Sequence, residues 1–374
     1  MSVVVKEVLT KKDLKKWVLF PNKLYKNNKY YVPFLFNDEM DTFTKQKNPA
    51  YEFSDTKLFI AYKDNKIVGR IAGLINHAYN KKWNKKAIRF TRFDFIDDYE
   101  VSTALFNEVI KWGKENSLNE VMGPIGFTDM DHEGMLIEGF EELNMSITFY
   151  NFPYYIDHME HLGLRKDVDW VEFQLVVPDK VDERMKKISE HIQKRSGYKA
   201  VFYTNRKTLH IEAREAFKLI DKEFGKLYGT VPLTNKVIEK AIADYIPLVN
   251  LKYICTIKDR DDKIVGFGAL VPSIAKALKK SNGKLLPFGI FRMLKALKGK
   301  NDTLEMFFVA VDEIHQKKGL PAILIDQILQ MCIDNGVKIC ETGPELEQNE
   351  AVQSMWKTFN ARRHKRRRCW IKEI

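Results

Sequence analysis

The chain has 374 residues, of which 45% are hydrophobic and 12% aromatic, so it can bury packed cores and is not a disordered chain. Its formal net charge of +12 favours acidic partners such as nucleic acid, an anionic membrane surface or phosphorylated ligands. The cysteines are widely spaced and include no C-x-x-C pair, which gives no indication of a zinc ribbon or a disulfide framework. No apolar run has the length of a signal peptide or a bilayer span, so we expect a cytoplasmic protein.

The first half of the chain reads as a mixture of helices and strands. Alternating apolar residues and turn residues predict a β-hairpin over 58–76, with its polar turn at Lys63–Asn65. The other expected elements of this half are a short helix after Thr10, a strand Ile88–Phe95, a helix Ser102–Glu115, a strand Glu120–Met122, a helix Pro153–Leu162 and a strand Asp169–Val177.

A second half begins after a predicted boundary at Pro178–Asp182. It contains another β-hairpin, over 252–272, again built on a polar turn. The remaining expected elements are a helix Val181–Arg195, a strand Tyr198–Thr204, two helices reaching Tyr245, a strand Leu304–Val311, a helix from Pro321 to Gly336, a strand Val337–Glu341 and a helix after Asn349.

The two halves look like copies of one domain. Lys66-Ile67-Val68-Gly69 recurs as Lys263-Ile264-Val265-Gly266, an offset of 263 − 66 = 197 residues, and each copy opens an apolar strand. After each copy the chain continues with a strand, a helix, a second strand and a Gly-Pro pair. This order predicts two α/β domains with mixed sheets, over residues 1–177 and 178–374.

Two basic segments depart from this shared plan. The insertion 275–300 is amphipathic, and we expect its helix to pack on its own domain, with a membrane-surface or lipid-chain role as the alternative. Near the C-terminus, Arg362–Arg368 (RRHKRRR) carries six positive charges. It predicts either a solvated basic strand or tail, or a surface for a specific contact.

The stretch from Leu304 to Gly336 joins an apolar strand to a helix through the charged turn Asp312–Lys318. Free backbone N–H groups and the positive end of the helix dipole meet at a helix N-terminus, and Lys317 and Lys318 add charge there. This turn is therefore our first candidate for binding a phosphate-bearing ligand.

The segment AVDEIHQKKGLPAIL resembles the acyl-CoA pyrophosphate loop of the GNAT superfamily of N-acetyltransferases, usually written R/Q-x-x-G-x-G/A. Pro321 stands where the last glycine or alanine is expected, and proline is tolerated in the first turn of a helix. The resemblance implies acetyl-CoA or another acyl-CoA as co-substrate. The residues that it assigns to the cofactor are Val309, Ala310, Val311, Gln316, Lys317, Lys318, Gly319, Leu320, Pro321, Ala322, Asn349 and Trp356.

The first half shares the order of elements but not this loop. After the strand Ile88–Phe95 the chain reads IDDYEVSTALF, with acidic residues where phosphates would need N–H groups and cations. The implied arrangement is a tandem of GNAT-like domains in which the N-terminal copy is degenerate.

The same resemblance implies the catalytic residues. Some family members carry a glutamate base six residues before the valine that Val311 matches, and Glu305 stands there, with Glu341 as a second candidate. An even spacing keeps Glu305 on the strand face of Val309 and Val311 if no bulge intervenes. The family's tyrosine acid is replaced by Trp356, whose indole donates a hydrogen bond but supplies no proton. The thiolate then leaves unprotonated, the acid lies elsewhere, or the site is not an acetyltransferase.

The interpretation that we favour is an acyl-CoA-dependent N-acyltransferase. The sequence does not identify the amine on which it acts. The alternative is a non-catalytic GNAT-fold protein that binds nucleic acid or an anionic membrane through its basic C-terminal segments. The basic segment Arg362–Arg368 has no interleaved aromatic residues on which bases could stack, which makes nucleic-acid binding the less favoured of the two. A third option is an aminoacyl-transferring relative that uses charged transfer RNA. We predict no metal site, since the pattern of Asp129, Asp131, His132, His158 and His161 is weak.

Overall fold

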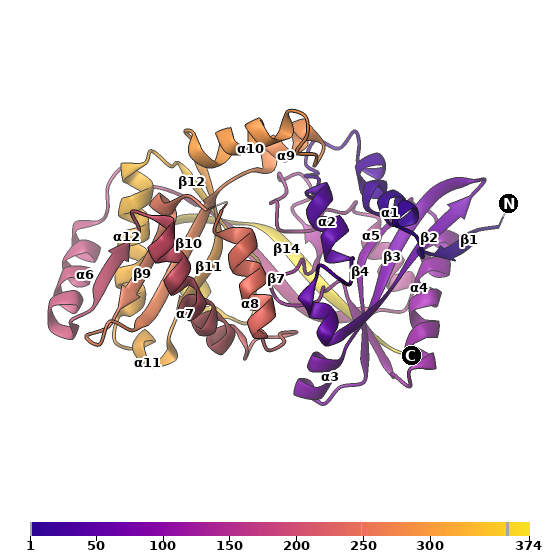
Figure 1. The fold of residues 1–374 in the computed structure, drawn as a ribbon, viewed down its shortest axis with the longest axis horizontal. Coiled ribbons are helices and arrows are strands. Elements are labelled where there is room, and N and C mark those ends of the chain that lie inside the picture. The colour runs from indigo at the N-terminus through magenta and orange to yellow at the C-terminus, as the bar shows by residue number, and fades with distance from the viewer. Residues whose placement is uncertain (1, 248, 357–358) are drawn as a thin grey trace.

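The computed structural model describes residues 2–247, 249–356 and 359–374. Figure 1 shows two α/β halves side by side, with the N-terminal half indigo to magenta and the C-terminal half rose to yellow. One large mixed sheet runs through both halves, so the expected α/β class with a mixed sheet is confirmed. Among the described residues, no helix is long and apolar enough to cross a membrane.

In the N-terminal half, each predicted helix and strand is present, with ends shifted by a few residues. Thr10 accepts a hydrogen bond from the N–H of Asp13 and so begins the first helix. The helices are α1 (Lys11–Leu24), α2 (Phe36–Thr42), α3 (His77–Trp83), α4 (Tyr99–Glu115) and α5 (Tyr155–His161), with a 3₁₀ turn over Pro49–Glu52. The strands are β1 (Val4–Glu7), β2 (Ser54–Lys63), β3 (Lys66–Asn76), β4 (Ala87–Phe95), β5 (Glu120–Gly123), β6 (Met135–Glu138) and β7 (Arg165–Val176).

The C-terminal half repeats the same order of strands, with three additional helices among the described residues. Its helices are α6 (Glu183–Ser196), α7 (Arg206–Phe224), α8 (Asn235–Tyr245), α9 (Ala275–Ser281), α10 (Gly289–Lys298), α11 (Glu313–Gln316), α12 (Leu320–Asp334) and α13 (Glu350–Trp356), with a 3₁₀ turn over Leu251–Tyr253. Its strands are β8 (Lys199–Phe202), β9 (Ile254–Lys258), β10 (Ile264–Pro272), β11 (Thr303–Val311), β12 (Ile339–Thr342), β13 (Glu345–Leu346) and β14 (Asn360–Glu373).

The halves exchange their last long strands. The sheet order is β1-β2-β3-β4-β5-β14-β7-β12-β11-β10-β9-β8. Strand β7, from the N-terminal half, pairs with β12 of the C-terminal half, while β14 pairs with β5 of the N-terminal half. The two exchanged strands also pair with each other, antiparallel, from Asn360 opposite Val176 to Ile371 opposite Arg165. The predicted division at residues 177 and 178 therefore falls in the loop after a strand that serves both halves.

Apolar helix faces cover both sides of the sheet in each half. In the N-terminal half, α4 covers one face through Val101, Leu105 and Val109, and α1 covers the other through Leu14 and Trp17. In the C-terminal half, α12 packs on one face, and α7 and α8 pack on the other. Both cores are large, which is the burial that a chain with this hydrophobic content predicts.

The basic segment Arg362–Arg368 is a strand and not a tail, and only part of it is solvated. It forms the middle of β14, where Lys365 and Arg367 are 1% and 0% exposed. Arg367 makes an ion pair with Glu172 of β7, and both side chains are fully buried. Charge runs are usually solvated, but here acidic residues of the neighbouring strands provide buried partners.

Candidate active site

The free edge of β11 is the first feature of the candidate site. This strand pairs with β10 along its whole length, but with β12 only over Thr303–Met306. From Phe307 to Val311, the edge of β11 that faces β12 is therefore not part of that ladder and forms an edge with which an extended ligand could pair, although the Val311 carbonyl already accepts from the Gln316 amide. Val309, Ala310 and Val311 lie on this segment, as the resemblance implies for an acyl-CoA arm.

A bulge changes the strand face on which Glu305 lies. The register between β10 and β11 shifts between Ala269 and Leu270. Leu304, Met306, Val309 and Val311 pack with the α12 core, so the alternation slips by one residue within β11. Glu305 therefore faces away from Val309 and Val311, and the sequence-based expectation of a shared face fails because the bulge does intervene.

Glu305 is buried, with 1% of its surface exposed, and is held by two hydroxyl groups. Ser273 donates to its Oε1 at 2.6 Å, and Ser146, from the other half, donates to its Oε2 at 3.1 Å. Burial raises the pKa of Glu305 to about 7, and the nearby negative charge of Glu341 acts in the same direction. A carboxylate with this pKa can accept a proton near neutral pH.

Glu341 lies beside Glu305, because the two residues are direct partners in the parallel pair of β11 and β12. Burial raises the pKa of Glu341, while the positive charge of Lys365 opposes that effect. Lys365 Nζ lies 3.9 Å from Glu341 and 3.5 Å from Glu172, and makes no hydrogen bond within the described part of the chain. Both predicted glutamates thus belong to one buried polar cluster at the junction of the halves.

The predicted anion-binding turn lies where β11 leads into α12. Gly319 is the N-cap of α12 with a φ of 82°, and no side chain caps this helix end. Only glycine adopts such a conformation freely, and a Cβ here would meet Ile192 of α6 at 2.6 Å. Gln316, Lys317 and Lys318 are exposed, and the Gln316 amide donates to the Val311 carbonyl at 2.9 Å.

Pro321 lies in the first turn of α12, where a missing N–H leaves no helical bond unmade. Leu320 is fully buried and fills the space beside Gly266 of β10, and Ala322 donates its N–H to the carbonyl of Gly319. The uncapped N-terminus, two exposed lysines and the positive end of the dipole together form a surface that favours phosphate.

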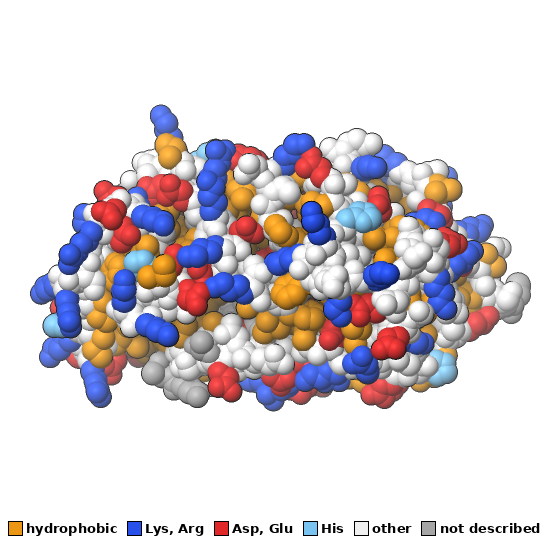
Figure 2. Space-filling model, turned by 90° about the horizontal axis from the view of Figure 1, so that it is seen from below, with side chains coloured by type: hydrophobic (Ala, Val, Ile, Leu, Met, Phe, Trp, Pro, Cys, Tyr) orange, Lys and Arg blue, Asp and Glu red, His pale blue; other side chains and the backbone are white. Residues whose placement is uncertain are grey.

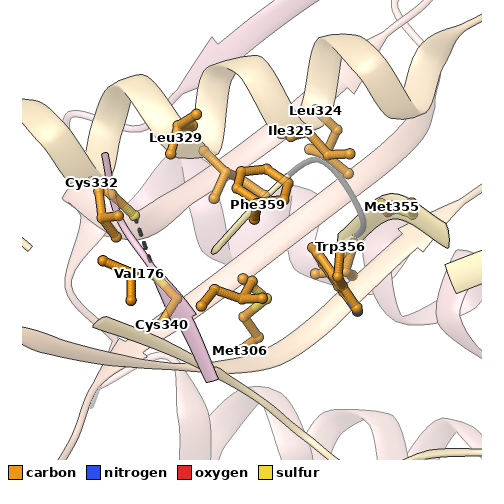
Figure 3. A pocket seen from close by; sticks show the side chains of 14 residues that line it. Val176, Met306, Leu324, Ile325, Leu329, Cys332, Cys340, Met355, Trp356 and Phe359 are labelled. Carbon is orange, nitrogen blue, oxygen red and sulfur yellow. Dashed lines mark hydrogen bonds between the residues drawn. The ribbon is translucent and has the colours of Figure 1, made fainter. Parts of the chain in front are cut away.

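An apolar cleft lies beside the free edge of β11 (Figure 3). It is lined from β11 by Met306 and Val309, from α12 by Leu324, and from α13 by Met355 and Trp356. Its free volume is about 30 Å³, which is room for no more than a water molecule or two. An acyl chain or a pantetheine arm would therefore need the side chains around this cleft to move apart.

Trp356 stands at the position of the family's tyrosine, with its indole N–H directed at Glu345. Its Nε1 donates to the two carboxyl oxygens of Glu345, at 2.9 and 3.1 Å. Burial raises the pKa of Glu345 to about 8, so this carboxyl group keeps its proton at neutral pH. Asn349 precedes α13 and accepts a hydrogen bond from the N–H of Val352 at 3.4 Å, and so caps this helix.

The N-terminal half has different residues at the equivalent positions. In the hairpin pairing, Leu74 lies opposite Arg89, just as Val271, 197 residues later, lies opposite Glu305. Arg89 is fully buried and donates to the carbonyls of Gly126 and Gly229 at 2.8 and 2.6 Å. Asp98 caps α4 by accepting from the N–H of Glu100, so an acidic side chain occupies that helix end.

Several residues of the cluster were missed by the sequence analysis. Ser146 comes from a segment with no motif, and Lys365 lies in the basic segment Arg362–Arg368, whose partners were not predicted. Both reach the glutamates only because the exchanged strands bring the halves together. Ser273 follows β10 directly, and a polar residue at that strand end was the one signal available. Glu345 follows Gly343-Pro344 and carried no sequence signal.

The histidines and aspartates of the weak metal pattern have other partners. Asp131 makes an ion pair with Arg92 at 2.7 Å, and His158 hydrogen-bonds to Ser102 at 2.7 Å. Among the described residues, no group of three or more His, Cys, Asp or Glu side chains is arranged to hold a metal ion.

Comparisons with known proteins find GNAT proteins among those similar to this chain. Residues 214–360 match the model of the acetyltransferase (GNAT) family. The chain is 26% identical to Protein YghO of Escherichia coli (strain K12), over 99% of this chain and 95% of that protein. It is 22% identical to the bacterial ceramide synthase of Caulobacter vibrioides, over 98% of this chain and 96% of that protein.

Solved structures share the fold along the whole chain. A tandem GNAT protein from the clavulanic acid biosynthesis pathway superposes with a TM-score of 0.57 and 11% identity, covering 100% of this chain and 98% of that one. A GCN5-related N-acetyltransferase from Sphaerobacter thermophilus gives a TM-score of 0.52 and 10% identity, covering 99% and 95%. At these identities the comparison shows the tandem fold and nothing finer.

Proposed function

Because residues 214–360 match the GNAT family model and the whole chain shares the fold of a tandem GNAT protein, we propose that it transfers an acyl group from acyl-CoA to an amine. The observation that carries the proposal is the combination found in the C-terminal half. A free strand edge, an uncapped helix N-terminus with two lysines and a buried carboxylate with a raised pKa occur around one strand, β11.

In this proposal the cofactor lies along β11 and across the start of α12. The phosphates lie at the turn between Gln316 and Ala322, where the positive end of the α12 dipole and the charges of Lys317 and Lys318 favour an anion. The pantetheine arm extends along the edge at Val309–Val311, where its amides can pair with the strand backbone. Its thioester end lies where β11 and β12 diverge after Met306, between the apolar cleft on one face of the sheet and Glu305 on the other.

An ammonium substrate must lose two protons to become a neutral amide, and the leaving thiolate must gain one. We assign the first step to Glu305, which accepts the proton of the ammonium group so that the nitrogen lone pair can attack the thioester carbonyl. The carbon–nitrogen bond forms, and the nitrogen then loses its second proton, which makes up for the proton given to the leaving thiolate. The carbon–sulfur bond breaks with its electron pair on sulfur, and Glu305 releases the first proton to solvent. Glu341 and Lys365 position and tune Glu305 from the adjacent strands.

Glu345 is our candidate for returning the proton. The indole of Trp356 cannot supply one, but it holds the carboxyl group of Glu345, which is protonated at neutral pH. A carboxylic acid beside the tryptophan would thus replace the tyrosine hydroxyl as the proton source. This assignment answers the chemical problem that the tryptophan poses.

The acceptor is proposed by its chemistry. The Caulobacter relative is named a ceramide synthase, and a ceramide is the amide of a long-chain amino alcohol. We therefore propose a long-chain amine as the first acceptor class to test, with either short or long acyl-CoA as the donor.

A transfer assay tests the proposal. The purified chain would be incubated with acetyl-CoA or palmitoyl-CoA and a set of amines that includes sphinganine, spermidine and a lysine peptide. Free thiol release and the mass of the amide product would both be followed. We expect an amide product with at least one pair, and its loss in Glu305→Gln. Absence of thiol release and of CoA binding in every case would contradict the proposal.

A further inference from the structure

The insertion between β10 and β11 carries a cluster of exposed hydrophobic side chains. Leu286, Phe288 and Phe291 are 78%, 65% and 68% exposed, and Ile290 and Leu294 are 40% and 42% exposed. All five lie within nine consecutive residues. Single exposed apolar side chains need no explanation, but a contiguous group of large ones marks an interaction surface.

The insertion itself packs on the protein, so loose packing does not explain why these side chains are exposed. Helix α9 is anchored by Ala275 and Leu278, which form a small core with Val32 and with Met293 of α10. Gly289, Met293 and Leu297 are buried and recur every fourth residue, so one stripe of α10 packs on the protein. The exposed residues Ile290, Phe291 and Leu294 lie on another face of the same helix.

Sequence reasoning thus described only part of this segment. The expectation that its helix packs on its own domain is met by Leu297 of α10, which lies in the core of the C-terminal half, whereas α9 also packs on Val32 of the N-terminal half. A second apolar face remains uncovered in the chain, and it begins in the loop at Leu286 and continues onto α10. Together we call residues 286–294 the apolar ridge.

Basic residues surround the apolar ridge. Residues 275–300 contain no Asp or Glu and eight basic residues: Lys276, Lys279, Lys280, Lys284, Arg292, Lys295, Lys298 and Lys300. The chain as a whole has a net charge of +12, so a large share of its excess charge lies in this short segment. On the opposite side of the molecule, Figure 2 shows acidic and basic side chains interspersed.

We propose that the apolar ridge and its basic flanks dock the protein on an anionic lipid surface. The large hydrophobic side chains would enter the boundary between headgroups and acyl chains, and the lysines would attract the headgroup phosphates. Charge complementarity decides the occupant, because an apolar surface whose own segment carries only basic charges matches an anionic bilayer. An acidic protein partner would not require bulky aromatic residues at the most exposed points.

The insertion lies close to the candidate active site, so docking on a membrane would place that site near the lipid surface. Figure 1 shows α9 and α10 along one side of the molecule, where they reach from the C-terminal half to the N-terminal half. Lys279 donates to the carbonyls of Asn28, Lys29 and Tyr31, which fixes the insertion to both halves. Ser273, which holds Glu305, lies two residues before α9. A membrane bound at the apolar ridge would therefore lie on the side of the molecule from which this serine is held.

Vesicle flotation with the full chain, without any CoA, tests the proposal independently of catalysis. We expect the protein to float with vesicles of phosphatidylcholine and phosphatidylglycerol in equal parts, and about tenfold less with phosphatidylcholine alone. Phe288→Ser/Phe291→Ser should lower the bound fraction about tenfold, because these side chains enter the bilayer boundary. Lys295→Glu/Lys298→Glu should abolish the preference for the anionic vesicles.

Matched control variants distinguish binding through the apolar ridge from nonspecific adsorption to the vesicles. Leu9→Ser/Ile211→Ser removes side chains that are 81% and 68% exposed elsewhere, and Lys187→Glu/Lys194→Glu removes exposed charge from α6. Both controls should bind vesicles like the unchanged protein. Equal flotation of the Phe288/Phe291 variant, or no flotation of the unchanged protein, would overturn the proposal. A dimer in solution that this variant dissociates would also overturn it, since a second copy would then cover the apolar ridge.

Discussion

The two halves of the molecule have the same frame and differ at the points where chemistry would occur. Each has a hairpin with a register shift in the pairing of its second strand, followed by a strand, a helix and a Gly-Pro pair. Within this frame, Glu305 of the C-terminal half corresponds to Arg89 of the N-terminal half. One is a buried carboxylate with a raised pKa, whereas the other is a buried cation that donates to backbone carbonyls.

The helix that follows shows the same contrast. Helix α12 begins at Gly319 with no side-chain cap and two lysines before it, whereas α4 begins at Asp98, which caps its own helix. Asp98 also makes an ion pair with Lys63 at 2.7 Å. An anion has a free helix end in one half, and in the other half it meets a carboxylate that already occupies that place. Two halves with the same fold can therefore differ in role: the C-terminal half offers a helix end to an anion, whereas the N-terminal half offers none at the equivalent helix and can serve as a structural support.

Glu305→Gln tests the base side of this comparison and should have the largest effect. Glutamine keeps the shape and can still bond the two serines, but it accepts no proton from an ammonium group. We expect kcat to fall by about 10²- to 10⁴-fold with little change in CoA affinity. Steady-state thiol release measures the first quantity and titration calorimetry the second. A rate within a factor of two of the unchanged enzyme would remove Glu305 from the proposed role.

Arg367→Met tests the junction that the exchanged strands create. Removal of the guanidinium leaves the carboxylate of Glu172 buried, with Lys365 at 3.5 Å as its remaining cation. We expect the free energy of unfolding to fall by about 3–5 kcal/mol, measured by denaturant titration. The double variant Arg367→Met/Glu172→Met should recover part of this loss. If the single variant unfolds like the unchanged protein, the halves are not joined through this pair.

Lys317→Asp/Lys318→Asp gives the C-terminal turn the acidic character of its N-terminal counterpart. The affinity for CoA should fall about 10- to 100-fold, because two favourable charges near the phosphates are replaced by two repulsive ones. Asp98→Asn is the matched change in the other half and should leave CoA binding unaltered. Equal CoA affinities for the unchanged protein and the two variants would show that the lysine turn does not bind CoA.

The dependence of kcat/KM on pH should be bell-shaped. The pKa of Glu305 is raised to about 7 and that of Glu345 to about 8, so the base is ionised and the acid protonated only in the narrow range between them. Below this range the rate should fall about tenfold per pH unit. Glu345→Gln should remove the alkaline limb and Glu305→Gln the acidic limb. An alkaline limb that persists in Glu345→Gln would exclude Glu345 as the proton donor.

The free energy of unfolding should also depend on pH because the pKa of Glu305 is raised, and this effect should be smaller than the effect on the rate. Since the folded state raises the pKa of Glu305 from 4.5 to about 7, the folded form resists ionisation. Its contribution is complete below about pH 4.5 and is lost as the pH rises to about 7. The unfolding free energy of Glu305→Gln, relative to the unchanged protein, should therefore increase by about 2–3 kcal/mol across this range. A difference that stays constant with pH would mean that the pKa is not raised.

The sequence predicted the local elements well, because helix and strand periods, caps and turns are local signals. Thr10 at the start of α1 and the hairpin turns are examples. The tandem fold followed from the repeated order of elements and is confirmed. The exchange of β7 and β14 could not be predicted, because strand pairing over long separations leaves no periodic signal.

The candidate site was predictable only where one segment carries it. Glu305 and the turn at Gly319 lie within the single stretch that resembles the GNAT loop. The bulge near Phe308 reversed the face of Glu305, since one extra residue in a strand is invisible in the spacing. Ser146 and Lys365 were missed because the strand exchange alone brings them to the glutamates.

Titration calorimetry of the full chain with CoA tests the central claim most directly. The account predicts a single binding site per chain, located in the C-terminal half, that is weakened by Lys317→Asp/Lys318→Asp and is indifferent to Asp98→Asn. Two equivalent sites, or binding that survives the lysine substitutions and is lost on changing Asp98, would contradict it.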